Sequence, residues 1–475
     1  MAYDLAERVD AYVEDIWEGV VRDIAALVSH PSIADASKGV DGAPFGPEVR
    51  SALDCGLSIA RRLGYEVSDD DGYIGIADIP GERNEHLATI AHVDVVPAGP
   101  GWGTDPFSME RREGWLLGRG VIDDKGPAVL SLYAGAFFLR EGMVPRYTFR
   151  ALLGCDEEVG MTDVRHYLAG HEQPLFLFTP DAEFPVCNAE KGCFGGTFKS
   201  APIESGAIRS WSGAEATNAI PSQSECVIAE PLSDLPAPRA NSCRIALEDA
   251  GEGCTRIFAQ GIGGHASLPE GTINAIALVV GYLHEVMDAQ PDLFDPAERA
   301  YLDLLSVVHD GTAGEGLGIA AESEAFGSLT CNAGTIEVAG GHILQTIDVR
   351  YPDSTTSDEM TMICGAHASR YGAEFIAGRA KDPFSVSADS PAVRALLNTY
   401  REVTGKSAEP FSMGGGTYAR NFKSAVSFGP EDNGLELPAW AGSMHGPNEA
   451  ANEQLLRDAL KMYIIALVRL NELEL

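Results

Sequence analysis

Residues 87–94 read LATIAHVD, an apolar run that ends in a histidine and an aspartate. The run has the length and composition of a buried β-strand. Two further apolar runs, YTFRALLGCDEE at 147–158 and LFLFTPD at 175–181, end in carboxylates in the same way. Because ligands of open α/β sheets bind beyond the carboxyl ends of the strands, these acid-tipped runs predict a site at one edge of a parallel sheet.

Helical segments alternate with these strands along the first part of the chain. Apolar residues recur at three- and four-residue spacing over 1–28, and helices are also predicted at 47–63, 127–142 and 162–170. Such alternation is typical of a mostly parallel sheet covered by helices.

The pattern changes near residue 195 to Gly/Ser-rich, alternating segments with predicted helices at 271–288 and 296–308. The first pattern resumes near 383, with a helix at 391–404 and a closing helix from about 451. We therefore predict an α/β fold, a mostly parallel sheet with flanking helices, interrupted by an inserted α+β lid domain. The predicted divisions are 1–194 and 383–475 for the catalytic domain and 195–382 for the lid.

The composition indicates which classes of partner and which cellular compartment to expect. The 475 residues include 70 acidic and 34 basic ones, a formal charge of -36 that repels the phosphate backbone of nucleic acids. The nine cysteines are scattered and form no CxxC pair, which favours a reducing cytoplasm over an oxidising compartment. We find no signal peptide pattern and no run long enough to span a membrane, so we expect no membrane partner.

The acidic clusters need cations if they meet at one sheet edge. His92 and Asp94 lie two residues apart in a strand, so both side chains can face one pocket. Asp123 and Asp124 precede a predicted helix; one of them could simply cap it, but two are more than a cap needs. A set of carboxylates with histidine nitrogen suits zinc, manganese or cobalt better than calcium, and His445 is the best-placed second histidine.

Seven segments, taken in their order along the chain, resemble motifs of the co-catalytic metallopeptidases, the family that includes carnosine dipeptidases, aminoacylases and carboxypeptidases. Among them, GRGVIDDKGP, PDAEFP and GGGTYAR look most similar to bacterial PepV-like and Sapep-like dipeptidases. The segments are HVD (92–94), GRGVIDDKGP (118–127), DEE (156–158), PDAEFP (180–185), GGHAS (263–267), GGGTYAR (414–420) and MHGPNE (444–449).

The resemblance implies that the site binds two divalent metal ions. Zn²⁺ is the expected ion, and Mn²⁺ or Co²⁺ are the alternatives. It implies that Asp123 bridges the metals and precedes a cis peptide bond to Asp124. Glu157 would be the general base that activates a metal-bridging water, and Asp94 would support His92. The implied ligands are His92, Asp123 and Asp181 for one metal and Asp123, Glu158 and His445 for the other.

The resemblance also implies a set of substrate-binding residues, mostly in the lid. His265 would stabilise the oxyanion, and Asn218 would grip the substrate carbonyl. Arg350, with the backbone N–H groups of Gly414 and Gly415, would bind a free C-terminal carboxylate, which selects dipeptides. The long insert implies that His265 acts within its own chain, so a monomer is expected, with a homodimer as the alternative.

Three other functions are alternatives to a metallodipeptidase. An N-acyl- or N-succinyl-amino-acid deacylase would use the same metals with a different amine-side pocket. A catalytically silent binding protein is disfavoured because all five implied ligands and Glu157 are present. A two-metal phosphoesterase is disfavoured by the scarcity of basic residues around the motifs.

Overall fold

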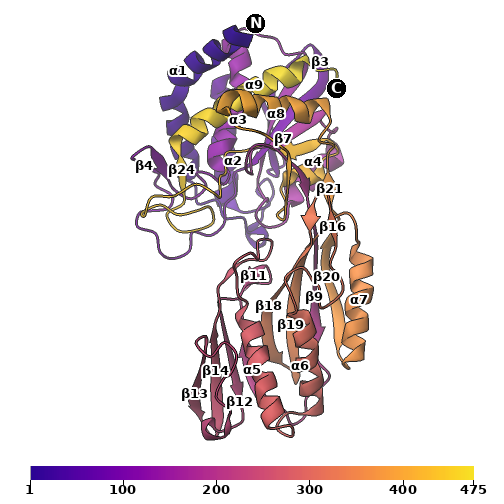
Figure 1. The fold of residues 1–475 in the computed structure, drawn as a ribbon. Helices are drawn as coiled ribbons and strands as arrows, with labels where there is room; N and C mark the ends of the chain where they lie inside the picture. The colour runs from indigo at the N-terminus through magenta and orange to yellow at the C-terminus, as the bar shows by residue number, and fades with distance from the viewer. Residues whose placement is uncertain (1, 215) are drawn as a thin grey trace. The chain divides into compact units, whose positions relative to one another are not determined.

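The computed structural model describes residues 2–214 and 216–475 of the chain. These residues form two compact units, drawn in Figure 1. Unit 1 comprises residues 1–189, 385–411 and 416–475, and unit 2 comprises residues 190–384 and 412–415. Residues 412–415, which the sequence pattern places with the catalytic domain, thus cluster with unit 2.

Unit 1 is built on a mixed nine-stranded sheet with a parallel centre (Figure 1). Strands β6, β3, β7 and β23 are parallel neighbours, whereas β1 and β2 join one side of the sheet in antiparallel fashion. In spatial order the strands are β1 (Glu66–Asp70), β2 (Ile74–Ile79), β6 (Tyr147–Gly154), β3 (Arg83–His92), β7 (Phe176–Thr179), β23 (Ala425–Ser427), β8 (Cys187–Glu190) and β21 (Phe384–Ser385), with β22 (Phe411–Met413) paired to β8.

Helices pack on this sheet and close the core of unit 1. Helix α3 is apolar and buried over most of its length because it contacts α1, α2 and α9 as well as β3 and β6. A small sheet of β24 (Ala450–Asn452), β5 (Trp115–Leu117) and β4 (Glu110–Arg112) leads into α9. The helices are α1 (Ala2–Val28), α2 (Pro47–Leu63), α3 (Lys125–Arg140), α4 (Thr162–Gly170), α8 (Pro391–Thr404) and α9 (Glu453–Glu472).

Unit 2 has its own hydrophobic core, formed by antiparallel sheets and helices. One sheet has the order β18-β19-β9-β20 and the other the order β10-β12-β14-β13. The first comprises β18 (Thr330–Ala339), β19 (His342–Tyr351), β9 (Gly192–Lys199) and β20 (Glu374–Lys381), and the second β10 (Ile208–Ser212), β12 (Gln223–Ile228), β14 (Cys254–Gln260) and β13 (Ile245–Gly251). Two short pairs, β11 (Ala219–Ile220) with β15 (Gly264–His265) and β16 (Glu322–Ser323) with β17 (Gly327–Ser328), and the helices α5 (Ala275–Ala289), α6 (Pro296–Val308) and α7 (Ser357–Arg370) complete the unit.

The predicted fold class is confirmed: a mostly parallel central sheet with helices is accompanied by separate antiparallel sheets. The helix predicted from residue 271 begins at Ala275, because the Asn274 side chain caps it by accepting from the backbone N–H groups of Ile276 and Ala277. The sequence pattern does not predict α7, whose apolar residues show only weak helical periodicity.

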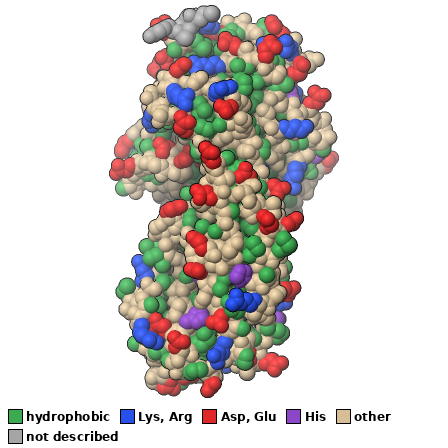
Figure 2. All heavy atoms as spheres, turned by 45° about the vertical axis from the view of Figure 1, so that its right-hand side comes forward, with side chains coloured by type: hydrophobic (Ala, Val, Ile, Leu, Met, Phe, Trp, Pro, Cys, Tyr) green, Lys and Arg blue, Asp and Glu red, His purple; other side chains and the backbone are tan. Residues whose placement is uncertain are grey.

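Acidic side chains are spread over the surface, and cysteines lie in both units. Figure 2 shows acidic side chains spread over the visible face of the molecule instead of gathered in one patch. All nine cysteines are free thiols. Over the ranges 2–214 and 216–475, no helix is long and apolar enough to span a membrane.

Candidate metal centre

Three parallel strands bring their carboxyl ends to one edge of the unit 1 sheet. Strand β3 pairs with β6 so that His92, its last residue, lies opposite Gly154, and β3 also pairs with β7. The residues that follow these strands, Glu157 and Glu158 after β6 and Asp181 after β7, therefore meet near His92. The sheet topology thus explains why acidic residues far apart in the sequence share one site.

The first group of potential ligands contains His92, Asp123 and Asp181, with one atom of each lying within 4.8 Å of the others. The His92 Nε2 atom lies 3.0 Å from Asp123 Oδ1 and 3.9 Å from Asp181 Oδ2. His92 is fully buried and the two carboxylates are largely so. One imidazole and two carboxylates form a donor set that suits a divalent transition metal.

The second group contains Asp123, Glu158 and His445 within the same 4.8 Å limit. The His445 Nε2 atom lies 2.7 Å from Asp123 Oδ2 and 3.3 Å from Glu158 Oε1. Asp123 is thus the one described residue that belongs to both groups, and it offers a different oxygen to each. The structure brings together all five residues predicted as ligands, in an arrangement that fits a pair of metal ions.

Charge interactions within the site shift several pKa values. Hydrogen bonds to Asp123 and Glu158 raise the pKa of His445 to about 11. Burial opposes the charged form of His92, but its hydrogen bonds to Asp123 and Asp94 outweigh burial and raise its pKa. Burial raises the pKa of Asp181 to about 7, and the Asp123 charge adds to that rise. Burial also acts to raise the pKa of Asp123, but hydrogen bonds to His445 and His92 lower it overall.

Glu157 lies beside the two groups but belongs to neither. Among the described residues, its buried Oε1 atom has no hydrogen-bond partner. Burial raises the pKa of Glu157 well above its ordinary value, and the charge of Asp181 adds to the effect. A buried carboxyl group with an unengaged oxygen and a raised pKa has the properties of a proton acceptor in catalysis.

Asp94 contacts His92 and also the segment that carries Glu157 and Glu158. Its carboxylate oxygens accept hydrogen bonds from the backbone N–H groups of Glu157, at 3.3 Å, and Glu158, at 3.2 Å. The His92 Nδ1 atom lies 2.9 Å from the backbone oxygen of Asp94 and 3.5 Å from its carboxylate. Asp94 therefore orients His92 chiefly through its carbonyl and positions the paired glutamates through its side chain.

The backbone around Asp123 is held by Glu449, the last residue of the MHGPNE segment, which the motif alone does not mark as functional. Glu449 Oε1 accepts from the backbone N–H groups of Gly120, Ile122 and Asp123 at 3.0, 3.2 and 3.4 Å. Glu449 Oε2 accepts from Arg119, and both side chains are buried. The peptide bond between Asp123 and Asp124 is cis, as the resemblance implies.

Truncation of Glu449 is expected to destabilise the protein. Glu449→Ala should lower the free energy of unfolding by about 3–5 kcal/mol, because Arg119 would remain buried without its partner and three backbone donors would lose their acceptor. Glu449→Gln should cost less, since an amide oxygen can still accept from the backbone. Urea unfolding of the two variants and the wild type measures this order, and wild-type stability of the alanine variant would contradict it.

The predicted lid residues His265, Asn218 and Arg350 lie in unit 2. Strand β15 pairs with β11 so that His265 lies opposite Ala219, and the Asn218 carbonyl accepts from Ala266 at 2.8 Å. The His265 Nδ1 atom lies 2.6 Å from Ser267 Oγ. The β11–β15 pairing therefore explains how two segments more than forty positions apart place Asn218 and His265 near each other.

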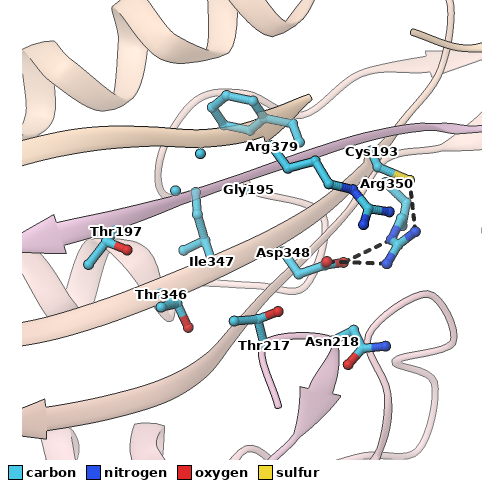
Figure 3. Close-up of a pocket in the computed structure, with 13 residues that line it drawn as sticks. Cys193, Gly195, Thr197, Thr217, Asn218, Thr346, Ile347, Asp348, Arg350 and Arg379 are labelled. Carbon is cyan, nitrogen blue, oxygen red and sulfur yellow. Dashed lines mark hydrogen bonds and ion pairs between the residues drawn. The ribbon is translucent and has the colours of Figure 1, made fainter. Parts of the chain in front are cut away.

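Arg350 lies on β19 and lines a cavity of about 460 Å³ within unit 2, together with Asn218 (Figure 3). Its Nε atom donates to Asp348 Oδ1 at 2.8 Å, and its Nη1 atom lies 3.2 Å from the carbonyl oxygen of Gly414. Gly414 and Gly415 belong to the short segment that clusters with unit 2. Arg350 thus contacts the carbonyl group of Gly414. Asp348 also lines the cavity, although none of the seven motifs contains it.

Comparison with known proteins identifies related chains. The model of Peptidase family M20/M25/M40 matches residues 88–469. The chain is 33% identical over 431 residues to "Putative dipeptidase YtjP" of Bacillus subtilis (strain 168), covering 87% of this chain and 90% of the relative. It is 28% identical over 483 residues to "Putative dipeptidase SH1171" of Staphylococcus haemolyticus (strain JCSC1435), covering 98% of both chains. Among solved structures, human carnosine dipeptidase 1 is similar with a TM-score of 0.58 at 14% identity, covering 99% of both chains.

Proposed function

Because the chain belongs to Peptidase family M20/M25/M40, we propose that it is a metallodipeptidase that hydrolyses dipeptides with a free C-terminal carboxylate. The observation that carries the proposal is the pair of ligand groups that share Asp123, with the carboxyl group of Glu157 beside them and in neither group. The names of the two bacterial relatives support dipeptides as the substrate class.

The residues present suit two divalent metal ions. His92, Asp123 and Asp181 would hold one ion, and Asp123, Glu158 and His445 the other. A bound pair of such ions lowers the pKa of water and polarises a carbonyl group. Imidazole and carboxylate ligands favour Zn²⁺, with Mn²⁺ and Co²⁺ as alternatives.

Glu157 would act as general base and then as general acid. Its carboxylate takes a proton from the attacking water and returns that proton to the leaving amine, so its net protonation is unchanged after one cycle. The raised pKa that burial produces suits a group that must hold a proton for part of the cycle. Asp94 keeps Glu157 in place through the hydrogen bond to its backbone N–H group.

Residues of unit 2 would bind the substrate. His265 would donate to the oxyanion, Asn218 would hold the carbonyl, and Arg350 with Gly414 and Gly415 would recognise the C-terminal carboxylate. His265 would serve its own chain, which makes a monomer sufficient for activity. The free state of all nine cysteines supports a cytoplasmic location.

Metal removal and a substrate panel test the proposal. Chelation is expected to abolish hydrolysis, and Zn²⁺, Mn²⁺ or Co²⁺ should restore it, because the water and the scissile carbonyl both depend on the cations. Initial rates should then be highest for free dipeptides and much lower for tripeptides, N-blocked dipeptides and N-acyl-amino acids. Faster cleavage of N-acyl-amino acids would identify a deacylase instead, and activity that survives complete metal removal would contradict both assignments.

A further inference from the structure

Arg119 belongs to the GRGVIDDKGP segment and lies beside the metal centre, but it is in neither ligand group. Its side chain is 1% exposed, and the carboxylate of Glu449, to which its Nη1 atom donates, is fully buried. Pairing with Glu449 explains one nitrogen of the guanidinium group. It does not explain the Nη2 atom, which faces backbone oxygens of two other segments.

The Nη2 atom of Arg119 contacts the backbone of His445, a predicted ligand in the second group. It lies 3.2 Å from the carbonyl oxygen of His445 and 3.2 Å from that of Gly446. The imidazole Nε2 atom of the same histidine lies 2.7 Å from Asp123 Oδ2. Because a guanidinium group carries five donors in one plane, Arg119 can serve Glu449 and these two carbonyl groups together.

His445 depends on such contacts because neither a helix nor a strand fixes it. It lies in the loop before β24, its side chain is 53% exposed, and its φ of +60° is in the left-handed region that residues other than glycine rarely adopt. Such a conformation persists only where neighbouring groups hold it. Within 2–214 and 216–475, the hydrogen bonds that connect the backbone of residues 443–447 to other parts of the chain come from Arg119.

The other predicted imidazole ligand is held in a different way. His92 is the last residue of β3, and its Nδ1 atom lies 2.9 Å from the carbonyl oxygen of Asp94. Arg119 reaches only the segment beyond this strand, where its Nη2 atom lies 3.4 Å from the carbonyl oxygens of residues 97 and 98. Loss of the Arg119 contacts should therefore affect His445 more than His92.

A simpler role for Arg119 is to neutralise Glu449 alone, since a buried carboxylate needs a partner of opposite charge. A lysine would meet that need with the same charge. The contact of Nη2 with two consecutive carbonyl groups goes beyond charge balance. The Trp102 ring, whose centroid lies 5.3 Å from the guanidinium carbon, also favours a planar cation at this position.

We propose that Arg119 is a positioning residue, which holds the backbone of His445 and so sets the affinity of the second ligand group for its metal ion. The first ligand group, which contains His92, depends on Arg119 much less. The proposal rests on the proposed function, from which it takes the two bound metal ions.

Titration of the metal-free full chain with Co²⁺, followed by calorimetry and by the visible absorption of bound Co²⁺, tests the proposal. Arg119→Lys keeps the positive charge beside Glu449 but loses the planar set of donors. The affinity for one of the two ions should therefore fall about 10- to 100-fold, the loss that follows removal of a group that supports a ligand. The affinity for the other ion should stay at the wild-type value. Equal weakening of both ions, or no weakening of either, would overturn the proposal.

Arg150→Lys is the matched control. Arg150 is also a largely buried arginine of unit 1, and it pairs with the carboxylate of Asp78 and with the hydroxyl group of Tyr167. Neither partner belongs to a ligand group. The control should bind two Co²⁺ ions as the wild type does, so that a loss confined to Arg119→Lys does not come from the mere removal of a buried guanidinium group.

A neutral pair keeps the test open if Arg119→Lys does not fold. Arg119→Met combined with Glu449→Gln removes both charges together, so that neither is left buried without a partner. The amide oxygen at position 449 can still accept from the backbone N–H group of Asp123. The same selective loss of one ion is expected, and wild-type affinity for both ions would count against the proposal.

A double substitution identifies which ion is affected. His445→Ala should bind one Co²⁺ ion, held by the first ligand group, and the further change Arg119→Lys should leave the affinity for that ion unchanged. If the further change weakens the remaining ion, Arg119 supports the whole metal centre instead of His445, and the proposal is wrong.

Metal binding needs no turnover, so the outcomes for function and for positioning are separate. If the wild type binds two Co²⁺ ions but hydrolyses no dipeptide, and Arg119→Lys still weakens one ion, the proposed function fails and the positioning role stands. If dipeptides are hydrolysed and Arg119→Lys binds both ions as Arg150→Lys does, the function stands and the positioning role fails.

Discussion

Replacement of Glu157 by glutamine is expected to lower kcat about 10²- to 10⁴-fold while both metal ions stay bound. Glutamine has the shape of glutamate but cannot accept the proton of the attacking water at neutral pH. Glu157 belongs to neither ligand group, and its backbone N–H group, which donates to Asp94, is unchanged by the substitution. Measurement of kcat together with the metal content of the purified variant checks both halves of this expectation.

A matched control separates the loss of the base from a general loss of negative charge. Glu66→Gln removes a carboxylate from β1 of the same unit. Glu66 is exposed and belongs to neither ligand group. The control should keep wild-type kcat. Near-normal turnover of Glu157→Gln would show that another group accepts the proton, and loss of metal from that variant would show that Glu157 is a ligand.

Replacement of Asp123 by asparagine should remove both metal ions and with them all measurable activity. Asp123 offers Oδ1 toward His92 and Oδ2 toward His445, so one substitution weakens both sites. An amide oxygen is a neutral, weaker ligand, and the amide nitrogen cannot take the place of the second oxygen. The loss of affinity should therefore exceed the about 10- to 100-fold change that follows loss of a group that only supports a ligand.

The neighbouring aspartate provides the control for this substitution. Asp124 accepts from the backbone N–H group of His92 at 3.1 Å and belongs to neither ligand group. Metal titration of Asp124→Asn should show two bound ions with at most a moderate loss of affinity. Two tightly bound metals in Asp123→Asn would contradict the bridging role of Asp123.

Much of the catalytic unit is predictable from local sequence signals. Helices with clear ends, such as Pro47–Leu63 and Pro391–Thr404, carry proline in the first turn and glycine after the last, and their bounds follow from those residues. The predicted ligands can be found because each follows an apolar strand or precedes a helix in a recognisable motif. Parallel strands in an α/β sheet then require their carboxyl ends to meet, whatever the details of packing.

Local sequence patterns do not predict contacts between segments that are far apart in the chain. Glu449 belongs to a recognisable motif, yet its hold on Gly120, Ile122 and Asp123 depends on the pairing of β24 with β5, more than three hundred positions away. Asp348 and Arg350 lie two residues apart on one face of β19, so their contact is local, but only the fold places both of them in a cavity with Asn218. Arg379 lies in no recognisable motif, and only the fold places it at the same cavity.

The sequence by itself determined the fold class, the candidate metal ligands and the chemical types of their side chains, because these depend on periodicity and on residue type. Tertiary structure alone decided which oxygen of Asp123 faces which histidine and how Asp94 and Glu449 hold the loops. The physical reason is that hydrogen bonding and charge balance in a buried site are properties of three-dimensional neighbours, which no local pattern specifies.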